Sequence, residues 1–237
     1  MGGFANNAPI VTDGLAFYVD AGNGNSYPGS GTTLGDLVGG NDGALTNMDA
    51  TNHSSANGGV FTFDGSNEIV DFGNILNMGT SDMSFFGWAK RTGGDGEQEW
   101  IMSKSYAGGG VGRYWIDFDN NTTLRVGAAW AEGHTDYYFS GTFSQDVWYN
   151  YAAVFDRNDK LYLYINGSLN TSYDISSHSS VNMTNTYPYR IGSYTGSNQS
   201  TPQYFLSGEV SCHLHYNKAL TASEILQNYN ALKNRFV

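Results

Sequence analysis

The stretch DRNDKLYLYINGS, residues 156–168, decides the fold of this chain. Three aliphatic side chains alternate along it with two tyrosines. They are Leu161, Leu163 and Ile165 on one parity, and Tyr162 and Tyr164 on the other. A β-strand sends successive side chains to opposite faces. We therefore expect the aliphatic set to point into a core and the two tyrosines to point away from it.

The neighbouring residues extend this strand into a meander. Asn166-Gly167 follows at once, and both residue types accept the positive φ that a two-residue hairpin turn requires. Aromatic and β-branched residues fill the segment upstream, and another alternating segment follows the turn. The pattern predicts three antiparallel strands at 147–155, 160–166 and 168–174.

The rest of the chain has the composition of an all-β protein. Its 237 residues include 31 glycines, aromatic residues make up 15% and charged residues 14%. Many short strands separated by turn residues are typical of sandwiches and barrels. Further strands are predicted at 14–20, 59–63, 67–72, 82–91, 99–104, 112–119, 122–130, 135–139, 188–193 and 205–216.

One helix is predicted, close to the end of the sequence. Thr221 is followed three residues later by Glu224, the spacing of a capping box. Apolar residues then recur at helical spacing, at Ile225, Leu226, Tyr229 and Leu232. We expect a short helix that closes the sandwich.

The charge of the chain excludes two classes of partner. With 11 basic and 22 acidic residues, the net charge is −11. Nucleic-acid binding needs clustered Lys and Arg, and so does docking on an acidic membrane surface. We therefore expect no nucleic acid and no membrane as partners. Cys212 is the single cysteine, so no disulfide forms within the chain, and its apolar surroundings indicate buried packing.

Several longer segments resemble one family. GLAFYVDAGNGNSYPGSGTTLGDLVGGNDGAL (14–45), GGVFTFDGSNEIVDFG (58–73), MSFFGWAKR (83–91), WYNYAAVFDRNDKLYLYINGSL (148–169) and GEVSCHLHYNKALTASEILQNYNALKNRF (208–236) are similar to the successive strands and closing helix of laminin-G-like, concanavalin A-like jelly rolls. The resemblance implies one two-sheet antiparallel jelly-roll domain over residues 14–237. Residues 1–13 lack core periodicity and are expected to form an N-terminal arm.

Two segments resemble a narrower group. SYPGSGTT (26–33) and LQNYNALKNRF (226–236) are similar to laminin-G-like structural proteins of tailed bacteriophage particles. This resemblance implies a virion location, other virion proteins as partners, and a multicopy or homo-oligomeric arrangement. No Sec-type signal is visible at the start of the sequence, which agrees with such a location.

A sugar site is predicted around WIDFDNN. Trp115, Asp117 and Asp119 share one strand face, where an indole can stack on a sugar and carboxylates can accept its hydroxyl hydrogens. In the stretch AWAEGHTDYY (129–138), we expect Trp130, His134, Asp136 and Tyr138 to line an adjoining strand or loop. One alternative is a solvated outer face whose Asp residues lead into the Asn120-Asn121 turn. Another is that Trp130 is buried, because it shares parity with Leu124 and Val126, and that Trp115 meets a neighbouring subunit.

No enzyme activity is expected. Glycosidases on this fold would carry Glu-x-Asp-x-Glu along one strand, and that pattern is absent. Glu97 and Glu99 share a parity without an acid between them, and no Gly-x-Ser-x-Gly elbow is present. His213 and His215 share a strand face and could ligate a metal, but an alternating strand explains them more simply.

Calcium is the expected structural cofactor. The stretches DAGNGN (20–25) and GGNDG (39–43) supply the oxygen ligands that hard cations prefer. In similar jelly rolls a calcium ion joins the first strand to the closing strand, so Asp20 and Asp42 are the expected donors. The alternative is that these residues form Asx turns with their own backbone.

The sequence thus predicts a non-enzymatic virion structural or decoration protein, as part of a capsid, neck, tail or fibre, with weak carbohydrate affinity. A glycan-binding module that recognises host surface polysaccharide is the first alternative. A divergent glycoside hydrolase is the second.

Overall fold

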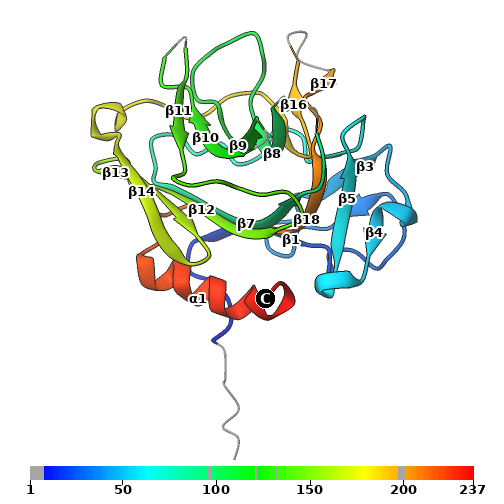
Figure 1. Ribbon diagram of the computed structural model, residues 1–237. Helices are drawn as coiled ribbons and strands as arrows, with labels where there is room; N and C mark the ends of the chain where they lie inside the picture. The colour runs from blue at the N-terminus through cyan, green and yellow to red at the C-terminus, as the bar shows by residue number, and fades with distance from the viewer. Residues whose placement is uncertain (1–7, 95–97, 121, 132, 197–200) are drawn as a thin grey trace, which may run out of the picture.

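The computed structural model describes residues 8–94, 98–120, 122–131, 133–196 and 201–237. The chain forms two antiparallel sheets packed face to face, as the sequence predicted, with one α-helix on the outside (Figure 1). Among the described residues, no helix is both long and apolar enough to cross a membrane.

The first sheet carries the meander. Its order is β14 (Ser168–Asp174), β13 (Lys160–Ile165), β12 (Trp148–Phe155), β7 (Met83–Arg91), β18 (Ser207–Tyr216), β5 (Val60–Asp64) and β4 (His53–Ser54). β1 (Leu15–Asp20) pairs with the second half of β18, beyond the part that pairs with β5. The closing strand β18 therefore holds the first strand, the central strand β7 and the outer strand β5 together.

The second sheet has the order β11 (Thr135–Tyr138), β10 (Thr123–Ala128), β9 (Tyr114–Asp119), β8 (Glu99–Lys104), β15 (Tyr189–Ile191), β6 (Ile69–Asp71), β3 (Gly43–Thr46) and β2 (Thr33–Leu34). A two-stranded ribbon, β16 (Tyr194–Thr195) and β17 (Pro202–Gln203), lies beside β8. Short 3₁₀ turns are η1 (Ala50–Asn52), η2 (Ala56–Gly58), η3 (Ser176–His178) and η4 (Lys233–Arg235).

The predicted hairpin is confirmed. Asn166 and Gly167 have φ values of 50° and 75°, which make the tight turn between β13 and β14. Leu161 and Leu163 are fully buried between the sheets, and Ile165 packs against the same core. The tyrosines point the other way, but Tyr164 is only 5% exposed because α1 (Ala222–Leu232) covers that face.

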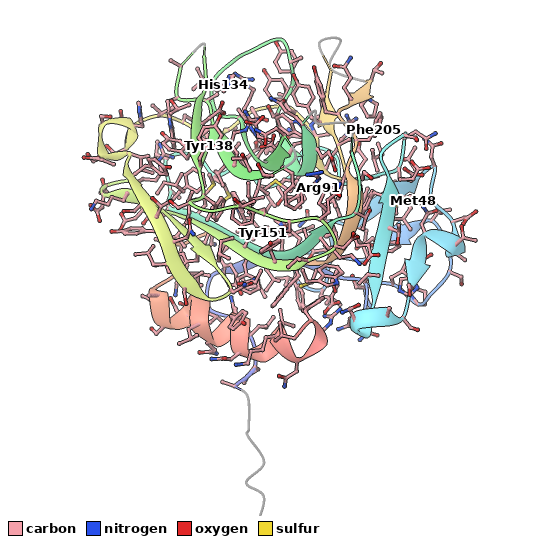
Figure 2. All side chains as sticks on the ribbon, viewed as in Figure 1. Met48, Arg91, His134, Tyr138, Tyr151 and Phe205 are labelled. Carbon is pink, nitrogen blue, oxygen red and sulfur yellow. The ribbon has the colours of Figure 1, made fainter. Side chains whose placement is uncertain are left out.

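Aromatic side chains and a histidine fill the space between the sheets. The ring of His213 lies between the hydroxyls of Tyr151 and Tyr189, at 2.9 and 2.6 Å. Tyr151 lies in the middle of the molecule in Figure 2. His215, two residues further along β18, is also fully buried, and neither of its ring nitrogens has a hydrogen-bond partner among the described residues.

The helix α1 closes the outer face of the first sheet. Thr221 and Glu224 form the predicted capping box, and Ile225 and Leu232 are buried against the sheet. Leu226, predicted to share this apolar face, is 46% exposed. Beyond the helix, the ring of Phe236 stacks on Trp88 of β7 at 4.1 Å between centroids.

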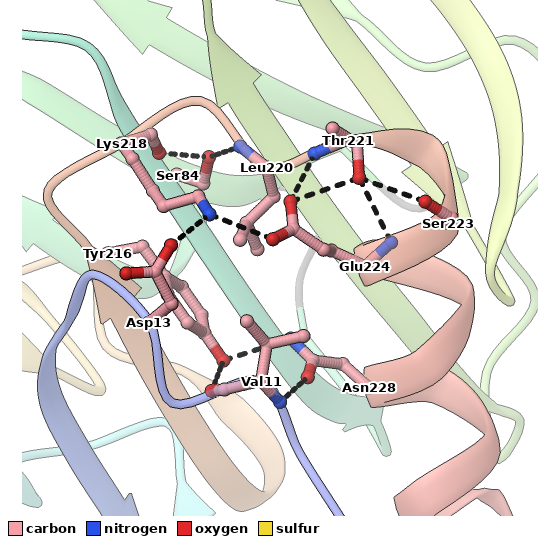
Figure 3. A network of polar contacts seen from close by, with 10 residues as sticks. All are labelled: Val11, Asp13, Ser84, Tyr216, Lys218, Leu220, Thr221, Ser223, Glu224 and Asn228. Carbon is pink, nitrogen blue, oxygen red and sulfur yellow. Dashed lines mark hydrogen bonds and ion pairs between the residues drawn. The ribbon is translucent and has the colours of Figure 1, made fainter. Parts of the chain in front are cut away.

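A polar network joins the start of the described chain to this helix (Figure 3). The Asn228 carboxamide accepts a hydrogen bond from the Val11 N–H at 2.8 Å and donates one to the Tyr216 hydroxyl. Lys218 Nζ bridges Asp13 and Glu224. Residues 1–7 of the expected arm lie outside the described residues, but Val11 is buried beside α1, so residues 9–13 belong to the domain.

Candidate functional site

The outer face of the second sheet carries a group of charged and aromatic side chains. Trp115 and Asp117 of β9 lie opposite Gly127 and Arg125 of β10, because the strands are antiparallel neighbours. A Cβ atom at Gly127 would lie 2.0 Å from the Trp115 ring. Glycine at this position therefore lets the indole lie flat across β10.

Arg125 is held by three carboxylates. Its Nε and Nη2 atoms contact the two oxygens of Asp117 at 3.0 and 2.5 Å, and Nη1 lies 3.1 Å from Asp136 and 3.5 Å from Asp119. Complete burial raises the pKa of the Asp117 carboxyl to about 7, against the effect of Arg125. Burial alone would lower the pKa of Arg125, but the bonds to Asp117 and the charges of Asp136 and Asp119 raise it.

Beside this charged group, three aromatic rings pack together on the same outer face. Trp100 of β8 lies 5.1 Å from Trp115 and 4.4 Å from Tyr194, between ring centroids. The three residues form a small apolar cluster separate from the core between the sheets. The cluster positions two indoles under the loops that follow β8 and β10.

A pocket of about 380 Å³ opens over this cluster. The aromatic residues Trp100, Trp115, Tyr194 and Tyr204 line it, with Gln98, Ser105, Ala107, Gly108, Gly109, Arg113, Arg125 and His134. Three buried groups of its lining have no hydrogen-bond partner among the described residues: Trp100 Nε1, Trp115 Nε1 and Ser105 Oγ. Buried donors without acceptors are costly, so a ligand that supplies acceptors is favoured here, provided that a small shift of the lining side chains opens these atoms to it.

A second pocket, of about 550 Å³, adjoins the first. Gln98 and Tyr204 line both pockets, and Asp64, Glu99 and Gln203 are among the other lining residues of the second. We name the two pockets together the Tyr204 groove. Phe205, at the edge of the second pocket, and His134, at the edge of the first, lie on the side of the molecule away from α1 (Figure 2).

Tyr204 is the residue that sequence reasoning missed. Its side chain is 42% exposed, and its φ of +52° is rare for a bulky residue. The backbone is fixed there because the Tyr204 carbonyl accepts a bond from the Trp100 N–H at 3.3 Å. Non-glycine residues held in this region of φ cluster at functional sites. Nothing in the stretch TPQYFLSGE signals this conformation, because it depends on the contact with β8.

Five of the predicted sugar-binding residues lie on one face of the second sheet, and Trp130 does not. Trp115, Asp117, Asp119, Asp136 and Tyr138 share the outer face of the second sheet, as their strand parities require. Trp115 and Asp117 are only 2% and 0% exposed, however, so they form neither an open platform nor a solvated face. Tyr138 is exposed but lies outside both pockets, with its hydroxyl 3.4 Å from Asp119.

Trp130 does not belong to the site, and its prediction as a sugar-binding residue is wrong. Its ring packs in the core between the two sheets, and its Nε1 donates to the Tyr137 hydroxyl at 2.8 Å. It shares this inward direction with Leu124 and Val126, which was the alternative interpretation of its parity.

The His134 side chain is 47% exposed and lies edge-on to Trp115 at the rim of the first pocket.

A family model described as the concanavalin A-like lectin/glucanases superfamily matches residues 64–226, more than half of the chain. The chain belongs to this superfamily. No curated protein sequence matches this concanavalin A-like chain.

Solved structures share the superfamily fold at low sequence identity. The binding domain of botulinum neurotoxin DC, in complex with rat synaptotagmin II, is 14% identical with a TM-score of 0.67, and the match covers 94% of this chain and 52% of that one. A structure reporting that cell entry of botulinum neurotoxin type C depends on two ganglioside molecules is also 14% identical, with a TM-score of 0.67 and coverages of 92% and 51%.

A mutant sialidase of Trypanosoma rangeli with trans-sialidase activity is similar over 97% of this chain and 35% of that one, with 14% identity and a TM-score of 0.64. The concanavalin A-like chain therefore spans between about a third and a half of these proteins. At this level of identity, the likeness shows the fold.

The expected calcium donors do not fit a metal in this jelly roll. Both carboxylate oxygens of Asp20 are used: one accepts from the Gly22 N–H, and the other from the Tyr18 hydroxyl and from Arg235. Asp42 Oδ1 accepts from the Asp36 N–H six residues earlier and so links two parts of this loop, whereas the Asx turn of the alternative interpretation is formed by Asp20 with Gly22. No group of three or more His, Cys, Asp and Glu side chains suited to a metal occurs among the described residues.

The guanidinium of Arg235 supplies the positive charge at this place instead. It contacts Asp20 of β1 at 2.9 Å and Ser211 of β18 at 2.6 Å. It also donates to three backbone carbonyls, those of Asn57, Gly58 and Gly59, at 2.9 to 3.1 Å. All five partners are oxygen atoms, so Arg235 joins the first strand to the closing strand as a bound cation would.

Proposed function

We propose that this chain is a non-enzymatic glycan-binding jelly-roll module whose site is the Tyr204 groove. The observation that carries the proposal is the trio of buried donors, Trp100 Nε1, Trp115 Nε1 and Ser105 Oγ, in a pocket lined by aromatic rings. Sugar hydroxyl and ring oxygens supply the acceptors that these donors lack. The exposed ring of Tyr204 supplies a stacking surface for the apolar face of a sugar.

The affinity of a single site is expected to be weak. A shallow site that combines one stacking ring with a few hydrogen bonds gives a Kd of about 1 mM, or about −4 kcal/mol. Multivalent display raises the apparent affinity without any new contact. The module would therefore work best in many copies.

A binding role is favoured over catalysis by the carboxylates beside the first pocket. Asp117, Asp119 and Asp136 all contact Arg125, so each is engaged as part of one charged group. A glycosidase needs one carboxyl free to act as acid and a second as nucleophile or base. Release of reducing ends from a polysaccharide that the protein binds would instead support the glycoside hydrolase alternative.

The location that we propose is a tailed bacteriophage particle, with the chain as a structural or decoration protein. Its support is the sequence resemblance of residues 26–33 and 226–236. The geometry is compatible with display: Pro9 contacts Gln227 of α1 at 2.7 Å, so the described start of the chain lies on the helix side. The strands β8, β16 and β17, which supply lining residues of the groove, are on the opposite side of the molecule (Figure 1). Mass spectrometry of purified particles tests this location, and absence of the chain from them would contradict it.

The binding proposal is tested with multivalent protein on a glycan array. The variant Tyr204→Gly removes the ring and suits the positive φ of this position, so the fold should remain intact while array signals are lost. Tyr138→Ala is the matched control, because Tyr138 is 40% exposed on the same side of the molecule but lines neither pocket. Equal loss of signal in both variants, or no signal for the wild-type protein, would reject the proposed site.

A further inference from the structure

We infer that the Tyr204 groove takes a neutral polysaccharide chain, at least two sugar units long, that crosses Tyr204, and that it discriminates against anionic sugars. This inference rests on the proposed function and specifies the ligand of the same site. It depends on three features of the groove: the state of its charges, the adjacency of its two pockets and the chemistry of its lining groups.

The charges of the first pocket do not suit an anion. Its two guanidinium groups are both engaged, Arg125 by three carboxylates and Arg113 by the backbone carbonyls of Tyr106 and Gly110 at 3.1 and 2.7 Å. The carbonyls leave the charge of Arg113 in place, but the three carboxylates of Asp117, Asp119 and Asp136 outnumber the two guanidinium groups, so the charges around the pocket do not favour a carboxylate or sulfate. The net charge of −11 adds a repulsion of anions over longer distances.

The charged residues that line the second pocket are also acidic. Asp64 and Glu99 are its charged lining residues, and the carboxylate of Glu99 lies 3.4 Å from Arg91 and accepts a bond from the Ser207 N–H. Its other polar lining groups include the carboxamides of Gln98 and Gln203. Carboxamides donate and accept hydrogen bonds, and so do sugar hydroxyls. An anionic sugar would therefore meet unfavourable charges in both pockets, whereas a neutral sugar finds partners in both.

The length of the ligand follows from the adjacency of the pockets. Each pocket, at about 380 and 550 Å³, has the size of a small-molecule site, for which the usual range is about 300–1,000 Å³. Because Gln98 and Tyr204 line both, a single linear ligand can occupy the two at once. The first pocket offers donors without acceptors, and the second offers mixed polar groups. Linking two weak subsites raises affinity through effective concentration.

The experiment is a calorimetric titration of the full chain with neutral oligosaccharides of one to six units, and with oligosaccharides of the same backbone that carry uronic acid. A neutral backbone is first chosen from the array. We expect the affinity to rise at least about tenfold between one unit and three units. We also expect the uronic acid series to bind at least about tenfold more weakly at low salt, with the difference shrinking as salt is added.

Two variants localise the effect. Gln203→Ala alters the second pocket and not the lining of the first, so it should reduce the gain in affinity between one unit and three units. Asp119→Asn removes one carboxylate beside Arg125, so it should narrow the gap between neutral and anionic ligands.

The outcomes separate this inference from the proposed function. Equal affinity for one unit and for longer chains, or tighter binding of the uronic acid series, would overturn the inference and leave the glycan-binding proposal standing. Absence of binding to every neutral and anionic glycan would overturn both. Melting temperatures within a degree or so of wild type confirm that each variant is folded.

Discussion

Arg235 shows at the level of one residue how a positive charge can join the two ends of the fold. Its guanidinium contacts Asp20, Ser211 and the carbonyls of residues 57–59. Asp20 is buried, so removing the cation leaves a carboxylate and several carbonyls without their partner. Breaking such a partly buried pair costs about 3 kcal/mol.

The prediction is that Arg235→Ala lowers the free energy of unfolding by about 3 kcal/mol, whereas excess chelator leaves the melting temperature of the wild-type protein unchanged. Arg235→Lys should recover only part of the loss, because an ammonium group cannot reach all five oxygens in the planar arrangement of a guanidinium. Thermal unfolding with and without chelator measures both effects. A melting temperature that falls on chelation would restore the calcium hypothesis for Asp20 and Asp42.

His213 and His215 make the stability of the core depend on pH. Burial lowers the pKa of both rings to about 3, and the neighbouring charges of His215 and Lys104 add to this for His213 and His215 respectively. The folded protein therefore keeps both rings neutral at pH values where the unfolded chain takes up protons. The free energy of unfolding therefore does not depend on these two rings above about pH 6.5. As the pH falls from about 6.5 towards 3, it decreases by about 1.4 kcal/mol per pH unit for each ring.

The variant His215→Phe tests this account. Neither nitrogen of His215 has a partner among the described residues, and the ring lies near Phe85, Tyr114 and Tyr189, so a phenyl ring is expected to fit. The variant should be more stable than wild type at pH 5, with a smaller gain at pH 8. His213→Phe is the contrasting change, because it breaks two hydrogen bonds and should destabilise the protein at both pH values. Parallel stability curves for wild type and His215→Phe from pH 5 to 8 would refute the account.

At the level of elements, the sequence predicted what short-range patterns control. The meander, the long strands and the capped helix were predicted to within a few residues because alternation and capping are local. The strands β2, β3, β4, β16 and β17 were missed: β3 has four residues and the others have two, so each is too short for its period to stand out.

The site was harder to predict because it depends on pairing between strands. Asp117 is buried since Arg125 lies opposite it, and that partner becomes visible only once the turn at Asn120 sets the register of β9 and β10. The spacing from Asp117 to Arg125 around this turn was a usable signal. Tyr204 gave no signal, because its place in the groove depends on contacts with residues distant in the sequence.

Gly167 tests how far the tight turn and the helix depend on each other. Its φ is 75°, and a Cβ atom there would lie 2.8 Å from the ring of Tyr229 on α1. We expect Gly167→Ala to cost at least about 2 kcal/mol, from the positive φ together with the clash. Gly40→Ala is the matched control, because Gly40 has a φ of 71° and open space around its Cβ position.

Denaturant unfolding measures the two glycine variants. The difference between them isolates the contact with α1, since both carry the same backbone penalty. Equal losses would mean that the helix shifts freely and that the turn does not constrain its position.

At the level of the whole molecule, the first sheet lies between two hydrophobic cores and contributes side chains to both. Leu161 and Leu163 face the core between the sheets, whereas Trp88, Tyr164 and Leu214 face the helix. The first pocket of the Tyr204 groove lies on the outer face of the second sheet, whose strands β8, β9 and β10 are on the side of the molecule opposite α1 (Figure 1). This order of layers explains why Tyr164 of the meander is not available to a sugar: the helix covers it.

Because the first sheet contributes to both cores, we predict that the helix and the two sheets unfold as one unit. Ile225 of α1 is fully buried against the first sheet, and Ile225→Ala should lower stability by about 3 kcal/mol through the cavity that it leaves. Leu226→Ala on the same helix removes a side chain that is 46% exposed and should change stability by less than about 0.5 kcal/mol. For both variants and the wild type, denaturant curves from far-UV circular dichroism and tryptophan fluorescence should coincide. The dichroism reports the strands of both sheets, and the tryptophans lie under the helix, between the sheets and under the groove. If Ile225→Ala produced a separate early transition in fluorescence, the helix would unfold independently of the sheets, and the first sheet would not couple the two cores.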